Sequence, residues 1–290
     1  MNSSNSSTQA LLLRRTPFGE SSLVVRVLTP DQGRVDLVAK GAYRTTSRFF
    51  AVLDWFHTLQ VGFRPKAQGL TPLQNAEWQV RRKHMTERRD RYLAGLTVLE
   101  LCDVAAQPGM PEPGLFELAT GCLDHLNSGS LPADLELVLF EAHFLELLGV
   151  APALLHCASC GGAAPTPPSS DRAAFSAGSG GRLCANCALA AHRLGRRVGT
   201  LPIQVLEAAH SIPSIPRDLL ACNLPDTDLV LRVRDLHGRY LDYHLESRLR
   251  TQQTFLGTTH RNAPERGPAP TFTPPSQPHD PVRNHGSHSS

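Results

Sequence analysis

Long apolar runs are missing from this 290-residue sequence. A membrane-spanning helix needs about 18 or more consecutive apolar residues, and no such stretch occurs. The Ser- and Asn-rich start, residues 1–9, also lacks the basic and apolar regions of a signal peptide. We therefore expect a cytoplasmic protein with no membrane partner.

Several enzymatic motifs are missing too. The sequence contains no GxxxxGK[ST] phosphate-binding loop, no GxSxG nucleophile turn and no HExxH metal site. Its isolated Asp and His residues show no spacing that singles out an acid and a base. We expect a protein that is not an enzyme, and we keep as an alternative a metal-dependent nuclease, which needs a carboxylate cluster.

Cysteine occurs seven times, an odd number that would leave one thiol unpaired in a secreted protein. Four of the cysteines form two close pairs, Cys157-x-x-Cys160 and Cys184-x-x-Cys187. Two such pairs can place four thiolates tetrahedrally around one Zn²⁺. We predict one structural Zn²⁺ at these four cysteines, with no open position for a catalytic water. A metal-free or redox site is the alternative.

The net charge of +3 conceals an asymmetry along the chain. Residues 1–92 contain 15 Lys and Arg against 7 Asp and Glu, a net charge of +8. The remainder has 14 against 19, or −5. A basic front part attached to a mildly acidic back part indicates a polyanionic partner for the front.

The front part has the pattern of β-strands. Turn-forming segments such as Pro30-Asp31-Gln32 separate five β-prone runs, at residues 11–14, 22–29, 33–40, 53–63 and 70–80. Five short strands within about 70 residues are typical of a small closed barrel of the OB type. We predict an OB-fold domain over residues 10–83 after a disordered start over residues 1–9, with an SH3-like barrel as the closest competitor.

The pattern changes to a helical period after residue 83. Apolar residues recur at helical spacing in four segments, residues 87–106, 114–127, 133–149 and 228–250. We predict an α+β protein whose barrel is followed by a helical bundle over residues 84–256. The zinc site is inserted in this bundle at about residues 153–192. Residues 257–290 are rich in Pro, Gly, His, Thr and Ser, which predicts a disordered tail.

A cluster of cations and hydroxyls follows the third β-prone run, in the segment Lys40-Gly41-Ala42-Tyr43-Arg44-Thr45-Thr46-Ser47-Arg48. Lys and Arg neutralise phosphates, Ser and Thr donate hydrogen bonds to them, and an aromatic ring can stack on an unpaired base. A plain solvated loop is the alternative. The other cations of residues 1–92 favour DNA, because so many on a small barrel cannot avoid one another. We expect them to form one continuous positive surface.

The order of these parts resembles the bacterial RecO recombination mediators. The resemblance runs from about residue 11 to residue 256. It rests on a set of short segments in a fixed order: Lys40-Gly41-x-x-Arg44, Trp55-Phe56, Phe140-Glu141, Leu148-Gly149-x-x-Pro152, the two CxxC pairs with Phe175-Ser176 and Gly180-Gly181 between them, Tyr240-Leu241-x-Tyr243 and Phe255-Leu256. The Pro/His-rich tail and a Pro/Ser insertion at residues 165–170 depart from the family pattern.

The resemblance implies a non-enzymatic protein of DNA repair. Such a protein binds single- and double-stranded DNA and anneals complementary strands. It acts with RecR and with the C-terminal peptide of single-strand-binding protein to load RecA. In the family the basic barrel contacts DNA, which we carry over to Lys40, Arg44 and Arg48. On charge grounds we add, as weaker candidates, Arg14, Arg15, Arg34, Arg81 and Arg82.

A protein of another class also fits part of the pattern. In a zinc-ribbon transcription or adaptor protein, the cysteine module itself contacts the partner. The barrel would then have no DNA to bind, and this difference separates the two hypotheses.

Overall fold

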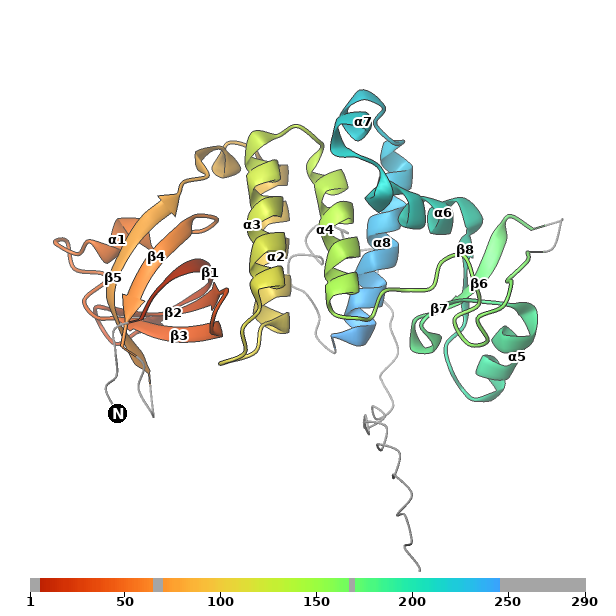
Figure 1. The fold of residues 1–290 in the computed structure, drawn as a ribbon, viewed down its shortest axis with the longest axis horizontal. Coiled ribbons are helices and arrows are strands. Elements are labelled where there is room, and N and C mark those ends of the chain that lie inside the picture. Colours follow the sequence, from red (N-terminus) through yellow and green to blue (C-terminus); the bar gives the residue numbers. More distant parts are fainter. Residues whose placement is uncertain (1–5, 65–69, 167–169, 246–290) are drawn as a thin grey trace, which may run out of the picture. The chain divides into compact units, whose positions relative to one another are not determined.

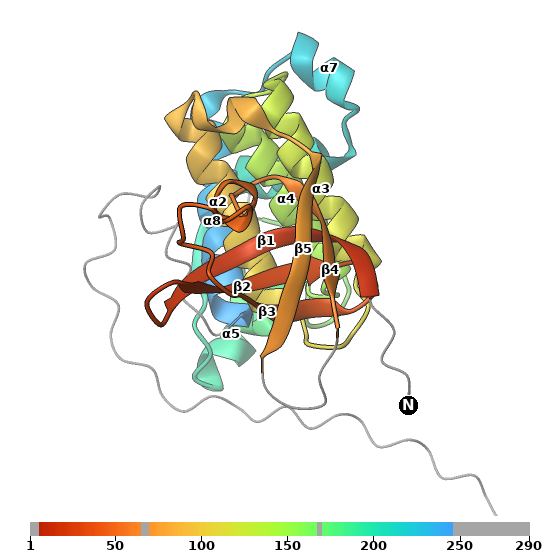
Figure 2. The same cartoon turned by 90° about the vertical axis from the view of Figure 1, so that its left-hand side faces the viewer.

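The structure is a computed structural model that describes residues 6–64, 70–166 and 170–245. Its first part is a closed barrel with the strand order β1-β2-β3-β5-β4 (Figure 1). All neighbouring strands are antiparallel except β3 and β5, which are parallel. Figure 2 shows β4 and β5 crossing the other three strands. The strands are β1 (Ser6–Phe18), β2 (Ser22–Thr29), β3 (Gly33–Ala39), β4 (Thr58–Phe63) and β5 (Thr71–Val80). This architecture confirms the expected five-stranded barrel.

Two details of the predicted barrel are wrong. Strand β1 begins at Ser6, so residues 6–9 are not disordered, because β4 supplies them with a hydrogen-bonding partner from Ser6↔Phe63 onward. The run at residues 53–63 is strand only from Thr58, after the short helix α1 (Phe49–Val52). The chain leaves the extended conformation at Phe56, whose φ is +70°.

The barrel interior is filled by alternate residues of its strands. In β2, Leu23, Val25 and Val27 are buried, as expected for a period of two. They pack in one cluster with inward residues of the other strands, among them Leu12, Leu37, Leu59, Val61, Phe63 and Leu73. Phe49 and Val52 pack against this cluster, whereas Leu11, Leu13 and Leu28 of the barrel belong to the core of the helical part.

The helical part contains the four helices expected from the sequence. They are α2 (Arg89–Ala105), α3 (Pro113–Ser128), α4 (Ala133–Leu147) and α8 (Thr227–His244). Helix α3 ends at the left-handed Gly129, and Asp226 caps α8 by accepting from the Leu229 N–H at 3.0 Å. Helix α4 contacts α2, α3 and α8 and is buried on several sides, which confirms its central position. Residues 246–250 of the expected last helix, Phe255-Leu256 and the tail lie outside the described residues.

Several smaller elements have no counterpart in the sequence prediction. A three-stranded sheet in the order β7-β6-β8 carries the cysteine region, and the rest are short helices. These elements are η1 (Lys83–Thr86), β6 (Arg172–Ser176), η2 (Ala177–Ser179), β7 (Gly181–Leu183), α5 (Ala185–Arg193), β8 (Gly199–Pro202), α6 (Ile203–Ser211), η3 (Ile212–Ser214) and α7 (Arg217–Cys222). Because β8 pairs with β6, the cysteine module extends to residue 202 instead of ending near residue 192.

Barrel and helices are joined by the buried side chain of Arg82, which is 2% exposed. Its guanidinium donates to the Phe56 carbonyl at 2.8 Å and to the Thr58 hydroxyl at 3.0 Å, both on the barrel. It also forms an ion pair with Asp124 of α3 at 2.8 Å and donates to the Thr120 carbonyl at 3.3 Å. One cation therefore holds two domains together.

The ring of Phe56 completes this junction. It is 1% exposed and lies edge-to-face with Tyr92 of α2, with ring centroids 5.4 Å apart. A Cβ atom on Gly95 of α2 would lie 2.6 Å from this ring, so only glycine lets the helix approach so closely. The hydrogen bond from Arg82 to the Phe56 carbonyl fixes the left-handed backbone that aims the ring at the helix.

We expect Arg82→Ala to lower the free energy of unfolding by about 2–4 kcal/mol, because it removes a buried charge-assisted network and leaves a cavity. Urea denaturation followed by circular dichroism measures the change. The matched control is Arg81→Ala, one residue earlier and exposed, which should change the stability by no more than about 0.5 kcal/mol. Equal stability of the two variants would contradict the role of Arg82.

Candidate functional site

The four paired cysteines meet in one cluster. The sulfurs of Cys157, Cys160, Cys184 and Cys187 all lie within 4.8 Å of one another. Tetrahedral zinc with Zn–S bonds of about 2.3 Å needs sulfurs about 3.8 Å apart, so small side-chain adjustments are enough to hold the ion. This donor set can bind a metal, and its four sulfurs would fill a tetrahedral shell.

Local structure explains why the sulfurs converge. The first pair lies in a tight turn in which the Gly161 N–H donates to the Cys157 carbonyl at 2.8 Å. The second pair begins helix α5, with Cys184 as the N-cap and Cys187 in the first turn. None of the four helical segments expected from the sequence includes this helix. The partial positive charge at the start of a helix favours thiolates there.

The cluster strongly perturbs its own thiols. Burial disfavours the Cys157 thiolate, but backbone N–H groups of Cys184, Cys160 and Ser159 donate to its sulfur and lower its pKa to about 6. Hydrogen bonds that the Cys187 thiol donates to neighbouring sulfurs, first to that of Cys184, raise its pKa to about 12. Ionisation of one sulfur thus opposes ionisation of the next, and a divalent cation between them would remove this repulsion.

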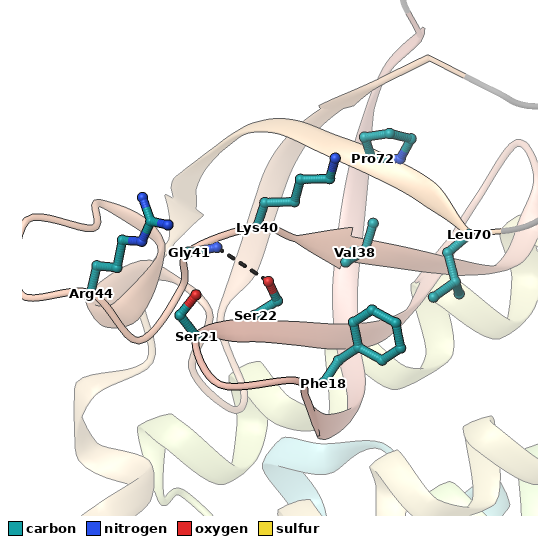
Figure 3. Close-up of a pocket in the computed structure, with 9 residues that line it drawn as sticks. All are labelled: Phe18, Ser21, Ser22, Val38, Lys40, Gly41, Arg44, Leu70 and Pro72. Atoms are coloured by element: carbon teal, nitrogen blue, oxygen red, sulfur yellow. Dashed lines mark hydrogen bonds between the residues drawn. The ribbon is translucent and has the colours of Figure 1, made fainter.

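A hollow of about 430 Å³ lies on the barrel surface (Figure 3). In Figure 3 the Phe18 ring and Leu70 lie beside Val38, Lys40 extends toward Pro72, and Arg44 lies at the other end beyond Gly41. The lining combines apolar side chains with two cations and no carboxylate: Phe18, Ser21, Ser22, Val38, Lys40, Gly41, Arg44, Leu70 and Pro72. Its turn is held by the Gly41 N–H, which donates to the Ser22 hydroxyl at 3.4 Å.

Aromatic rings at and beside this hollow are unusually exposed. Phe18 is 53% exposed, and Tyr43 and Phe50 are 46% and 67% exposed. The last two lie edge-to-face, with centroids 6.4 Å apart. Sequence reasoning named Tyr43 but missed Phe18 and Phe50, because only the barrel brings the end of β1 beside the loop after β3. The Tyr43 N–H donates to the Ser21 carbonyl at 2.9 Å, which ties the segment after β3 to the turn between β1 and β2.

The strongest candidate cations, Lys40 and Arg44, are both exposed at this hollow, and neither forms an ion pair among the residues that the structure describes. Arg48 is also exposed, but its guanidinium donates to the Gln74 carbonyl at 2.7 Å and lies 5.5 Å from the Phe49 ring. Arg48 therefore fixes the loop that carries the other two.

Three of the weaker candidates serve the fold instead. Arg82 is wrong as a DNA contact, because it is buried at the domain junction. Arg15 is exposed, but it donates to the Leu53 carbonyl at 3.0 Å, pairs with Asp54 at 3.6 Å and lies 4.8 Å from the Trp55 ring. Arg34 is half-buried, with its Nε enclosed and its backbone bonded to residue 107. We therefore remove these three arginines from the candidate surface.

The remaining candidates are exposed. Arg14 is exposed on β1, and Arg81 lies over the Trp78 ring at 3.8 Å from its centroid. Arg26, another barrel cation, is neutralised by Asp36 at 2.8 Å and by Asp103 of α2 at 3.0 Å, and the hydrogen bond to Asp36 raises its pKa. The expected continuous positive surface is therefore wrong in part, since carboxylates of the helices neutralise the side that faces them.

These features define a class of protein, a five-stranded OB-type barrel joined to a helical domain with a cluster of four cysteines that can bind a metal. Comparison with known proteins gives the family. Residues 1–80 match the family model "Recombination protein O N terminal", and residues 86–253 match "Recombination protein O C terminal". The "DNA repair protein RecO" of Geobacter metallireducens is 36% identical over 195 residues, which cover 66% of this chain and 75% of that protein. The chain belongs to the RecO family of DNA repair proteins. Within the described ranges, no helix is long and apolar enough to span a membrane.

We expect Cys184→Ser to reduce the zinc content from about one ion per chain to almost none and to lower the melting temperature by several degrees. Inductively coupled plasma mass spectrometry and thermal denaturation measure the two effects. Cys222→Ser is the control, because Cys222 is exposed and lies outside the cluster. If the Cys184 variant melts like the wild type, the cluster is not a structural metal site.

Proposed function

We propose that this chain is a non-enzymatic recombination mediator of DNA repair. It binds single- and double-stranded DNA on the barrel and anneals complementary strands. With RecR, it helps to load RecA onto DNA coated by single-strand-binding protein, whose C-terminal peptide docks on the helical domain. These activities place it in the cytoplasm with the nucleoid.

The observation that carries the proposal is the union of two cations without an ion pair among the described residues and the exposed Phe18 ring at one hollow, with two further exposed rings on the segment after β3. Lys40 and Arg44 provide positive charge for phosphates, and Phe18, Tyr43 and Phe50 offer faces for unpaired bases. The hollow spans strands β1, β2, β3 and β5 next to the turn between β1 and β2. OB-fold proteins bind oligonucleotides on strands 2 and 3 and on the neighbouring loops.

Annealing follows from the same surface. Two complementary strands repel each other through their phosphates, and a cationic face lowers this repulsion while bases remain free to pair. No nucleotide hydrolysis is needed for this step. The proposed Zn²⁺ at the four cysteines would stabilise the helical domain, because a complete sulfur shell leaves no position for substrate.

The zinc-ribbon adaptor hypothesis makes a different prediction about the barrel. It requires the cysteine module to contact the partner and the hollow to be irrelevant. Matches to both RecO domains and the charged hollow favour the mediator.

We expect Lys40→Glu combined with Arg44→Glu to weaken binding to single-stranded DNA by about tenfold or more. The slope of log K against log salt should fall by about two units, one for each lost phosphate contact. Fluorescence anisotropy at several salt concentrations measures both quantities. The annealing rate of complementary oligonucleotides should fall in parallel, with or without single-strand-binding protein.

The control for this pair is Arg232→Glu combined with Arg239→Glu. Both arginines lie on α8, and each forms an ion pair on the same helix, with Asp228 and Asp235. The control changes the net charge by the same amount and should leave DNA binding within about twofold of the wild type. Wild-type binding by the Lys40/Arg44 variant would refute the barrel site, and cleavage of labelled DNA in Mg²⁺ or Mn²⁺ would refute the non-enzymatic assignment.

We expect Phe18→Ala combined with Tyr43→Ala to weaken binding to single-stranded DNA more than binding to duplex DNA. Each base that stacks on an aromatic ring contributes about 1–3 kcal/mol, and paired bases are not free to stack. Competition between labelled single-stranded and duplex oligonucleotides measures the preference. An equal loss for both substrates would show that the rings do not stack on bases.

A further inference from the structure

The cysteine module, residues 153–202, is basic although the rest of the back part is acidic. It contains five arginines and one acidic residue, Asp171. Two of the arginines serve the fold. Arg182 is buried and donates to the Ala164 carbonyl at 2.7 Å, and Arg172 donates to the Thr200 carbonyl at 2.7 Å. The three that remain, Arg193, Arg196 and Arg197, are exposed and lie within five residues.

The three arginines flank the turn at the end of helix α5, Arg193 before it and Arg196 and Arg197 at and after it. The Gly195 N–H donates to the His192 carbonyl and the Arg196 N–H donates to the Ala191 carbonyl, both at 3.0 Å. With Gly195 at φ +72°, these two bonds form a Schellman turn that reverses the chain. A hollow of about 520 Å³ opens at this turn, lined by His192, Gly195, Arg196, Arg197, Val198 and Gly199.

No carboxylate neutralises these cations. Within the described part of the chain, Arg193, Arg196 and Arg197 form no ion pair. Arg196 makes only long contacts of 3.4 Å, to the Gly178 carbonyl and the Ser179 hydroxyl. The exposed arginines of α8 behave differently, because Arg232 and Arg239 each have an acidic partner one turn away.

The partial negative charge at the end of helix α5 compensates only one of the three arginines. A cation in the last turn of a helix interacts favourably with its partial negative charge, and Arg193 is the last residue of α5. Arg196 and Arg197 lie after the turn, where this effect has largely decayed. No acidic group among the described residues pairs with them, so their charge is available to an external anion, and guanidinium groups match phosphate oxygens in geometry.

We propose that the turn after α5 is a second phosphate-binding surface, formed by Arg193, Arg196 and Arg197, which binds the backbone of a DNA strand. The inference rests on the proposed function in taking DNA as the ligand. The barrel packs on α2 and α3, whereas the cysteine module contacts α6 and α8, so the two surfaces belong to different modules. One chain can then hold one strand on the barrel and a second strand on the cysteine module.

A strand-bridging assay with the full-length protein tests this surface. A biotinylated single strand is immobilised, the protein is added, and capture of a second labelled, non-complementary strand is measured. Arg193→Gln combined with Arg197→Gln should reduce capture by about fivefold or more and lower the salt slope of binding by about one to two units. The annealing rate should fall by a similar factor. Zinc content and circular dichroism like those of the wild type establish that the variant is folded.

Two control variants make the result specific. Arg193→Lys combined with Arg197→Lys keeps the charge and should retain most of the capture. Arg232→Gln combined with Arg239→Gln removes the same charge from α8 and should behave as the wild type. Wild-type capture and salt slope in the Arg193/Arg197 variant would overturn the second surface. The proposed function would still stand if the Lys40/Arg44 variant is defective, and it fails separately if that variant binds DNA normally.

Discussion

The structure depends on one buried guanidinium, that of Arg82. It binds a carbonyl and a hydroxyl of the barrel and a carboxylate of α3 at the same time, so barrel and helices share a buried charge-assisted network. Beside it, the Phe56 ring fits against a helix only because Gly95 has no side chain. Removal of charge at this point would leave barrel carbonyl and hydroxyl groups buried without a donor.

The cations of the barrel fall into two groups, according to whether they have an acidic partner. Some form ion pairs within the protein, as Arg26 does with Asp36 and Asp103. Others, Lys40 and Arg44 above all, have no carboxylate partner within the described part of the chain and lie at a hollow with an exposed phenyl ring. Acidic residues of the helical domain thus restrict the positive potential of the barrel to the side that is open to solvent.

The cysteine cluster links two separate segments in the second half of the chain. It joins the turn at Cys157 to the start of α5, and α5 in turn presents three arginines at its other end. A metal at the cluster would thereby fix a cationic turn that lies about ten residues away along a rigid helix. The strand annealing proposed for this chain requires cations positioned for two strands, and a basic barrel with a basic cysteine module meets that requirement.

The sequence alone determined the barrel, the four main helices and the metal cluster, because each has a local signature. Alternation of apolar residues predicts strands, a period of 3.6 predicts helices, and CxxC spacing predicts paired sulfur ligands. Only the tertiary structure decided which cations are free. Arg81 and Arg82 are neighbours in the chain, yet one lies exposed over Trp78 and the other is buried at the junction. Whether a charge is exposed depends on carboxylates and backbone carbonyls of segments that are distant in the sequence, such as Asp124 and Phe56. No local sequence pattern predicts these contacts.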